Sequence, residues 1–379
     1  NNRAHFYNEI GQIKNARKDL KKALSLNPNS TETYEIMGDL EYENAYEYQE
    51  YLNAITQYEK AVGLYKVQKD SLSVAYCLQS IASCYLELDS LEKSLSFCNK
   101  AIRFDPSSAE AYITRGLTHD YMDEYHLALT DMNKSISIEP ENSYYYFEKG
   151  NLQYRNQYFK EAIKAFRFCF EQDSLDIDYL NTLVQSLNKV GQYDEGIKYL
   201  ENYLDFPNLN LSQLSNALRI KGSLCAPMGQ HEQAVRSYTE ALVLDINDET
   251  RAWLLFLRGK VFMKIERYDS AKNDFKSAIK IFPDYPECIA SLCYATYALK
   301  NTEEAFKIVN KHIKRYPESR LFYYCRSKFF MDQNNFEAAK QDILRTIEMD
   351  KKDPEGYYYL ALLNFRNKKY FQSVRNFNK

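Results

Sequence analysis

Residues 255–283 read LFLRGKVFMKIERYDSAKNDFKSAIKIFP, and they contain one copy of a pattern that recurs along the chain. Within this copy Gly259, Ala271 and Pro283 mark three fixed places. The small residue at the place of Ala271 returns at intervals of 34 to 40 residues, at Ala16, Ala54, Ser94, Ala128, Ala162, Gly196, Ala234, Ala271, Ala305, Ala339 and Ser373. A period near 34 predicts stacked helical hairpins, each too small to bury its own apolar face.

Each position of the pattern has a physical reason. Leu20 and Ala23 follow Ala16 at spacings of four and seven residues, which places the three on one face of a helix. Glycine in the first helix is expected to let that helix approach the alanine of the second. Proline stops the second helix before the next hairpin begins, at Pro28, Pro106, Pro140, Pro283 and Pro317.

This pattern resembles the tetratricopeptide repeat, in which a large apolar residue, a glycine, an alanine, an aromatic residue and a proline recur in this order. Eleven units are counted in frame, the first lacking most of its opening helix and the last ending inside its closing helix at Lys379. The resemblance implies an all-α fold: a right-handed α-solenoid, or superhelix, of about eleven stacked hairpins. About 22 helices and essentially no strand are expected.

The spacing of the repeats predicts one array over residues 1–379 with four insertions. The insertions fall within residues 43–52, 67–73, 207–212 and 247–250, and they divide the array loosely into blocks 1–68, 75–208 and 215–379. Both ends of the array cut through a hairpin. We therefore expect that the native polypeptide continues beyond this chain.

Composition excludes several classes of partner. The 49 basic and 52 acidic residues give a net charge of -3, so no basic excess is available to neutralise nucleic-acid phosphates. No apolar stretch approaches the ~20 residues of a membrane span, so direct membrane insertion is not expected. Asn1-Asn2-Arg3 is no signal peptide. A cytoplasmic location is favoured, with a periplasmic or surface-anchored one as the alternative if a leader was removed.

The eight cysteines all fall within predicted helices, where free, packed thiols are favoured over disulfides or metal ligands. No phosphate-binding glycine loop, Cys-x-x-Cys, His-Glu-x-x-His or Gly-x-Ser-x-Gly occurs. His119 and His126, with carboxylates between them, raise the idea of a metal site, but a solvated helix end is the favoured interpretation. No catalytic residue, metal or cofactor is predicted, and the chain is interpreted as non-enzymatic.

In the family that the repeats resemble, the first helix of each hairpin lines an inner groove through its second, fifth, ninth and twelfth residues. The N-terminal end of this groove is acidic and polar, with Glu35, Asp39, Tyr42, Gln79 and Ser83. Elsewhere the groove positions carry many aromatic residues. Such an aromatic stripe suits a peptide groove, although the same rings would also serve to pack against the next hairpin. The predicted groove residues are Trp253, Phe256, Lys260, Met263, Tyr294, Tyr297, Tyr324, Lys328, Tyr358, Phe365, Tyr144 and Phe147.

The resemblance therefore implies a non-enzymatic scaffold that binds a protein or peptide segment in its groove. The alternative is a regulatory or assembly region of a larger protein whose catalytic, signalling or membrane-anchoring part lies outside this chain. An enzyme within these residues is a distant third. Some family members grip a C-terminal carboxylate with lysines, asparagines and an arginine in three successive repeats. No three repeats here complete that clamp, so chaperone C-terminal tails are disfavoured as partners.

Overall fold

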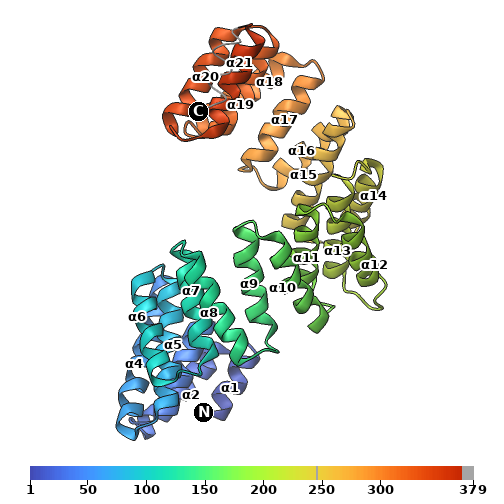
Figure 1. Cartoon of the computed structure of the whole chain (residues 1–379). Coiled ribbons are helices and arrows are strands. Elements are labelled where there is room, and N and C mark those ends of the chain that lie inside the picture. The colour runs from blue at the N-terminus through green and yellow to red at the C-terminus, as the bar shows by residue number, and fades with distance from the viewer. Residues whose placement is uncertain (245, 369–379) are drawn as a thin grey trace. The chain divides into compact units, whose positions relative to one another are not determined.

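The protein is helical throughout the residues that the structure describes (Figure 1). The structure is a computed structural model describing residues 1–244 and 246–368. These residues form 21 α-helices and no strand, which confirms the all-α architecture predicted from the repeat. They group into two compact units, Asn1–Gln192 and Tyr193–Lys379, named unit 1 and unit 2. The predicted closing helix around Ser373 lies outside the described residues.

Unit 1 contains the first eleven helices, and each packs against the next along the chain. Their bounds are α1 (Asn2–Glu9), α2 (Ile13–Leu26), α3 (Thr31–Glu43), α4 (Tyr48–Gln68), α5 (Ser71–Glu87), α6 (Leu91–Phe104), α7 (Ala109–Tyr121), α8 (Tyr125–Ile138), α9 (Ser143–Arg155), α10 (Phe159–Gln172) and α11 (Ile177–Lys189). Helix α5 also contacts α7, and α7 contacts α9. First helices therefore stack on first helices, as a solenoid requires.

Unit 2 repeats this arrangement, with α15 contacting α17, and α17 contacting α19. Its described helices are α12 (Tyr193–Leu204), α13 (Leu211–Cys225), α14 (His231–Leu242), α15 (Asp248–Lys264), α16 (Tyr268–Ile281), α17 (Pro286–Ala298), α18 (Thr302–Arg315), α19 (Arg320–Asp332), α20 (Phe336–Met349) and α21 (Pro354–Arg366). Tyr-Asp pairs at 193–194 and 268–269 open α12 and α16. The acidic residue of each pair therefore lies in the first helical turn, where its negative charge interacts favourably with the helix dipole.

The repeated small residue lies at the centre of each hairpin. Ala16, Ala128 and Ala271 are fully buried, and every other described member of the series is buried too. The packing glycines correct one expectation. A Cβ on Gly38 or Gly259 would lie 2.6 Å from a ring carbon of Tyr58 or Phe275, four residues beyond the repeated alanine. These glycines therefore make room for an aromatic ring. At Gly116 a Cβ would lie 3.2 Å both from the Ala128 carbonyl oxygen and from Cγ of Met132, which has the place of the ring.

One residue in nearly every hairpin turn adopts a left-handed backbone. The residues are Gly11, Asp89, Asp123, Gln157, Gly191, Gly229, Glu266, Lys300, Asn334 and Lys368, all with φ between 51° and 78°. This conformation reverses the chain directly after the first helix, much as a helix C-terminal cap does. The turn therefore returns with the same period as the buried alanine, and it sets the second helix against the first.

Candidate binding surfaces

A groove in unit 2 is lined mainly by the first helices α15, α17 and α19. We call it the lysine–tyrosine groove. Its volume is about 730 Å³, and its lining residues are Lys260, Met263, Lys264, Tyr268, Ser291, Tyr294, Tyr297, Ala298, Lys300, Lys328, Phe329 and Asp332. Five of the residues predicted from the sequence meet here: Lys260, Met263, Tyr294, Tyr297 and Lys328.

The lysine–tyrosine groove carries a positive charge. Four lysines line it against the single carboxylate of Asp332, and Arg366 neutralises that carboxylate with an ion pair of 2.6 Å. The ammonium group of Lys260 lies 5.4 Å from the ring centre of Phe256, and that of Lys328 lies 4.9 Å from the ring centre of Tyr294. Each ammonium group thereby makes a cation–π contact with an aromatic ring.

The tyrosines of this groove are held by neighbouring rings. Tyr297 stacks on Phe329 with ring centres 4.2 Å apart and planes within 8°, while Tyr294 meets the same ring edge-on at 5.6 Å. Burial raises the pKa of the Tyr294 hydroxyl. The groove therefore has a pre-formed aromatic wall, which would lose little side-chain entropy when it is covered by a ligand.

Two of the predicted groove residues belong to the core instead. Phe256 is 6% exposed and packs against Phe275, and Tyr324 is 3% exposed and stacks on Tyr359. Both residues lie three positions before the small residue at which their first helix packs closely against the second helix. Side chains at this position contact the following hairpin. Ala290 has the same place in α17 and is 3% exposed. The prediction that Phe256 and Tyr324 touch a ligand is therefore wrong.

The remaining predicted residues are distributed over other surfaces. Trp253 is 43% exposed and borders a separate 590 Å³ pocket with Arg219 and Tyr285. Tyr358 and Phe365, both on α21, are 53% and 58% exposed and do not line the lysine–tyrosine groove. Phe147, in unit 1, is half-buried and packs against Phe166 and Tyr179. Tyr144, also in unit 1, is 44% exposed.

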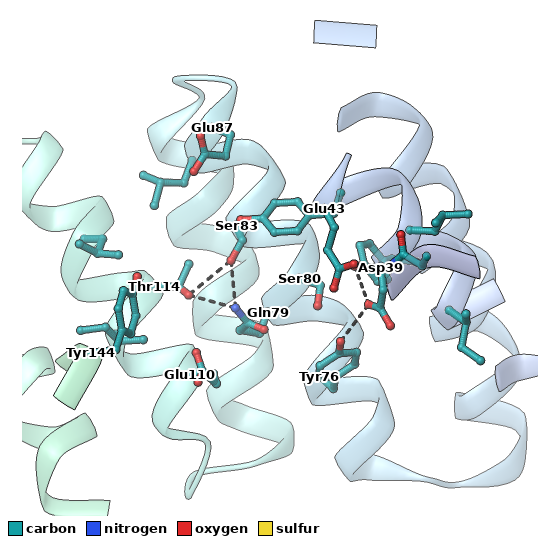
Figure 2. Close-up of a pocket in the computed structure, with 18 of the residues that line it drawn as sticks. Asp39, Glu43, Tyr76, Gln79, Ser80, Ser83, Glu87, Glu110, Thr114 and Tyr144 are labelled. Carbon is teal, nitrogen blue, oxygen red and sulfur yellow. Dashed lines mark hydrogen bonds between the residues drawn. The ribbon is translucent and has the colours of Figure 1, made fainter. Parts of the chain in front are cut away.

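Unit 1 has a pocket of opposite charge, which we call the acidic pocket (Figure 2). It has a volume of 620 Å³ and is lined largely by α1, α3, α5, α7 and α9. Figure 2 shows carboxylates distributed around it, and tyrosines supply the aromatic surface. No lysine or arginine is among the lining residues whose side chains are described. The charged and aromatic lining residues are Asp39, Glu43, Glu87, Glu110, Tyr42, Tyr58, Tyr76 and Tyr144.

Sequence reasoning found this pocket only in part. The groove positions of the repeat had marked Asp39, Tyr42, Gln79 and Ser83 as an acidic and polar end, and Tyr144 was predicted as a contact residue. The carboxylates of Glu43 and Glu87 were missed. Their signal was present, because each follows a groove position by four residues and so lies one turn along the same helix face.

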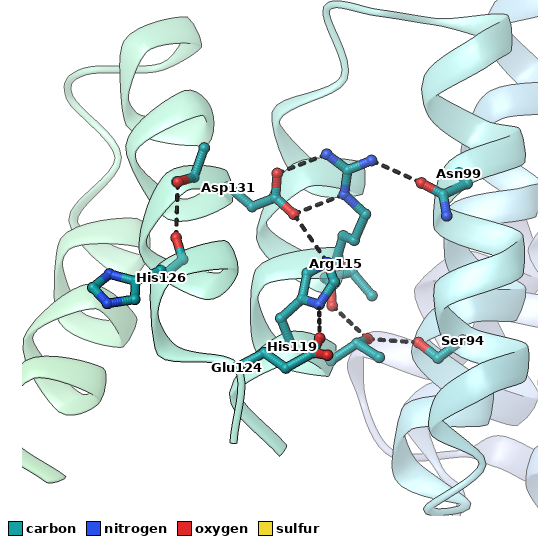
Figure 3. Close-up of polar contacts among 10 residues, drawn as sticks. Ser94, Asn99, Arg115, His119, Glu124, His126 and Asp131 are labelled. Atoms are coloured by element: carbon teal, nitrogen blue, oxygen red, sulfur yellow. Dashed lines mark hydrogen bonds and ion pairs between the residues drawn. The ribbon is translucent and has the colours of Figure 1, made fainter. Parts of the chain in front are cut away.

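His119 takes part in a buried polar cluster and does not lie at a solvated helix end (Figure 3). It is 8% exposed, its Nδ1 lies 2.6 Å from Glu124 Oε2, and its Nε2 lies 3.9 Å from Asp131 Oδ2. The ring of His126 points away from this cluster in Figure 3. Throughout the described part of the chain, no group of three or more His, Cys, Asp or Glu side chains is arranged to hold a metal ion.

The cysteines are placed as predicted. All eight are free and buried. Burial raises the pKa of the thiols, to about 12 for Cys84, Cys98, Cys169 and Cys288. None of the described helices combines the length and apolar character that would let it cross a membrane.

Comparison with known proteins identifies the repeat. Family models described as the tetratricopeptide repeat match residues 1–30, 75–108, 109–142 and 254–285, and a second such model matches residues 330–370. The chain is a tetratricopeptide repeat protein. Proteins of this family act mainly in protein–protein interaction, and the sequence-based interpretation of the repeats is confirmed.

Individual relatives are distant. A TPR repeat-containing protein of Methanocaldococcus jannaschii is 23% identical over 79% of this chain and 54% of its own length. The Hsp70-Hsp90 organizing protein of Triticum aestivum is 21% identical over 61% of this chain and 39% of its own. The chain thus spans about half or less of these relatives. Yeast Tom70, a solved structure, is 14% identical over 91% of this chain and 83% of its own, with a TM-score of 0.49.

Proposed function

We propose that this chain is a non-enzymatic scaffold that binds a peptide segment of a partner protein in the lysine–tyrosine groove. The observation that carries the proposal is the convergence of Lys260, Lys328, Tyr294 and Tyr297 from three successive first helices onto one groove. Lysines favour an acidic segment, chiefly by speeding association, while the tyrosine wall supplies contact area. Trp253, Tyr358 and Phe365, the exposed predicted residues of unit 2, would extend the contact only for a longer partner.

A chaperone tail is a rival occupant, because relatives include Hsp70-Hsp90 organizing proteins. A tail of that kind would be held by its terminal carboxylate, and no three successive repeats here supply the residues of the clamp. We therefore propose an internal acidic segment. The two occupants differ in one measurable property, since amidation of the peptide C-terminus would abolish tail binding and leave internal-segment binding unchanged.

The test is a fluorescence anisotropy titration of the 379-residue chain with a labelled peptide of alternating glutamate and serine, in free-acid and amidated forms. The variant Lys260→Glu/Lys328→Glu should weaken binding at least tenfold, about 1.4 kcal/mol. The matched control is Lys307→Glu/Lys340→Glu, which makes the same charge change on exposed residues of second helices α18 and α20. Equal affinity of the groove and control variants, each with an unchanged helical circular dichroism signal, would refute the proposal.

A further inference from the structure

The acidic pocket of unit 1 combines four carboxylates with tyrosine rings in one cavity, and no lysine or arginine is among its described lining residues. Asp39 Oδ1 accepts hydrogen bonds of 2.8 Å from the hydroxyls of both Tyr58 and Tyr76. Glu43 accepts from the Asn8 amide at 2.6 Å. These hydroxyl and amide donors are neutral, and they orient the carboxylate oxygens that they contact.

The other two carboxylates are similarly placed. Glu110 accepts a hydrogen bond of 2.8 Å from the Tyr145 hydroxyl, which is again neutral. Glu87 makes no hydrogen bond or ion pair with any described residue. Carboxylates gathered in one cavity repel one another, and a cation entering the pocket would relieve that repulsion.

A second observation is independent of the carboxylates. Gln79, about nine-tenths buried, donates its amide nitrogen to Ser83 Oγ at 2.9 Å and to Thr114 Oγ1 at 3.1 Å. Figure 2 shows the amide nitrogen directed at these two partners, with the side chain at the centre of the pocket lining. Its carbonyl oxygen accepts no hydrogen bond from the described residues. This oxygen therefore remains available to accept a hydrogen bond from a group that enters the pocket.

Aromatic rings border the same space. Tyr144 is 44% exposed, and the pKa of its hydroxyl is raised by burial and by the charges of Glu148, Glu110, Tyr42 and Glu87. Burial and the charge of Glu87 likewise raise the pKa of Tyr42, to about 12. These two tyrosines and the two glutamates therefore sit within electrostatic reach of one another. Ring faces beside carboxylates attract ammonium and guanidinium groups through cation–π and ionic interactions together.

We propose that the acidic pocket binds a lysine- or arginine-containing segment of a partner protein, with the cationic side chain entering between Tyr42, Tyr144, Glu87 and Glu110. The Gln79 carbonyl oxygen accepts a hydrogen bond from the cationic group or from the peptide backbone. A volume of 620 Å³ exceeds what one side chain fills, and the lining spans several successive first helices, so the occupant is a chain segment. The inference extends the scaffold role to a second site and does not depend on the lysine–tyrosine groove.

The test uses the intact chain and three fluorescein-labelled probe peptides with lysine–serine, arginine–serine or glutamate–serine repeats, titrated at low and moderate salt. The two basic peptides should bind, and added salt should weaken them. Glu43→Gln/Glu87→Gln should weaken basic-peptide binding at least tenfold, and Tyr144→Leu severalfold. The matched control Glu92→Gln/Glu171→Gln removes the same charge from exposed residues of α6 and α10 and should leave binding unchanged.

Each outcome decides one question. Equal loss of basic-peptide binding in the pocket and control variants would show that net charge alone attracts the probe, and would overturn the inference. Displacement of the peptide by spermidine at matched concentration would make the pocket a small-amine site, and would overturn the protein-segment assignment. The Lys260→Glu/Lys328→Glu variant keeps the acidic pocket intact and should bind the basic peptides at least as well as the unaltered chain. Failure of this site therefore stays distinguishable from failure of the lysine–tyrosine groove.

Discussion

Arg326 binds Asp342 through two parallel hydrogen bonds, Nε to Oδ2 at 2.8 Å and Nη2 to Oδ1 at 2.6 Å. Its Nη1 also donates to Asn310 Oδ1 at 2.6 Å on α18 of the preceding hairpin. One guanidinium therefore joins two hairpins. The same arrangement recurs at Arg115 with Asp131 and Asn99, and at Arg258 with Asp274 and Thr239.

Removing either partner of the Arg326–Asp342 pair should destabilise unit 2. The Asp342 side chain is 7% exposed and that of Arg326 is 23% exposed, so each single alanine variant leaves a poorly solvated charge. We expect a loss of about 2–4 kcal/mol in the free energy of unfolding for each. The double alanine variant should cost less than the sum, as measured by urea unfolding in a double-mutant cycle.

The control for this pair is Arg345→Ala. Arg345 forms only exposed ion pairs, with Glu318 at 3.7 Å and Glu348 at 3.6 Å. Its loss should change the free energy of unfolding by no more than about 0.5 kcal/mol. A cost for Arg345→Ala as large as that for Arg326→Ala would contradict the assigned role of the buried pair.

Two glycines of the α3–α4 hairpin should respond oppositely to alanine. A Cβ on Gly38 would lie 2.6 Å from the Tyr58 ring, whereas one on Gly63 would have no heavy atom within 4 Å. Gly38→Ala should cost about 1–3 kcal/mol through overpacking. Gly63→Ala should stabilise by about 0.5–1 kcal/mol, because alanine is the better helix former. Thermal unfolding of both variants checks the sign, and a stabilising Gly38→Ala would refute the ring-packing account.

Tyr324 should behave as a structural residue and not as a binding residue. Its hydroxyl donates to Asp353 Oδ2 at 2.5 Å, and Asp353 is 7% exposed. Tyr324→Phe should therefore lower stability by about 1–2 kcal/mol while leaving the affinity for the acidic peptide unchanged. Tyr294→Ala, in the lysine–tyrosine groove, should weaken that affinity severalfold. Peptide titration of the two variants measures both affinities. If Tyr324 were a contact residue, Tyr324→Phe would weaken peptide binding more than Tyr294→Ala does.

The thiols should make stability fall at alkaline pH. Folded Cys84, Cys98, Cys169 and Cys288 have pKa values raised to about 12, above the ordinary value of 9.0. The unfolded chain thus loses these protons first, and the folded state becomes less stable as pH rises from about 9 toward 12. Urea midpoints at pH 8 and pH 10 should show this decline, and Cys84→Ala should reduce it. An identical midpoint at both pH values would exclude the effect.

Thiol reactivity offers a separate check. Because all eight cysteines are buried and free, a disulfide-exchange reagent at pH 8 should modify them slowly in the native protein and should count eight after denaturation. Rapid native modification of several thiols would show that the helices pack less tightly than the structure has them.

The architecture could be predicted from the sequence because its signal is local. The buried alanine, the proline after the second helix and the helical spacing of apolar residues all depend on neighbours within one hairpin. The partner of the packing glycine could not be predicted in this way. Gly38 and Tyr58 meet through the relative rotation of two helices, and the spacing of the repeats leaves that rotation open.

The binding surfaces divide in the same manner. The sequence by itself determined which helix faces turn toward the groove, and so placed Lys260, Tyr294 and Lys328 together on the lysine–tyrosine groove and Asp39, Tyr42 and Gln79 together at the acidic pocket. Only the tertiary structure decided that Phe256 and Tyr324, on equally regular groove positions, are covered. The reason is that helical periodicity specifies only the direction in which a side chain leaves its own helix. Whether that side chain is exposed depends on where the next hairpin packs.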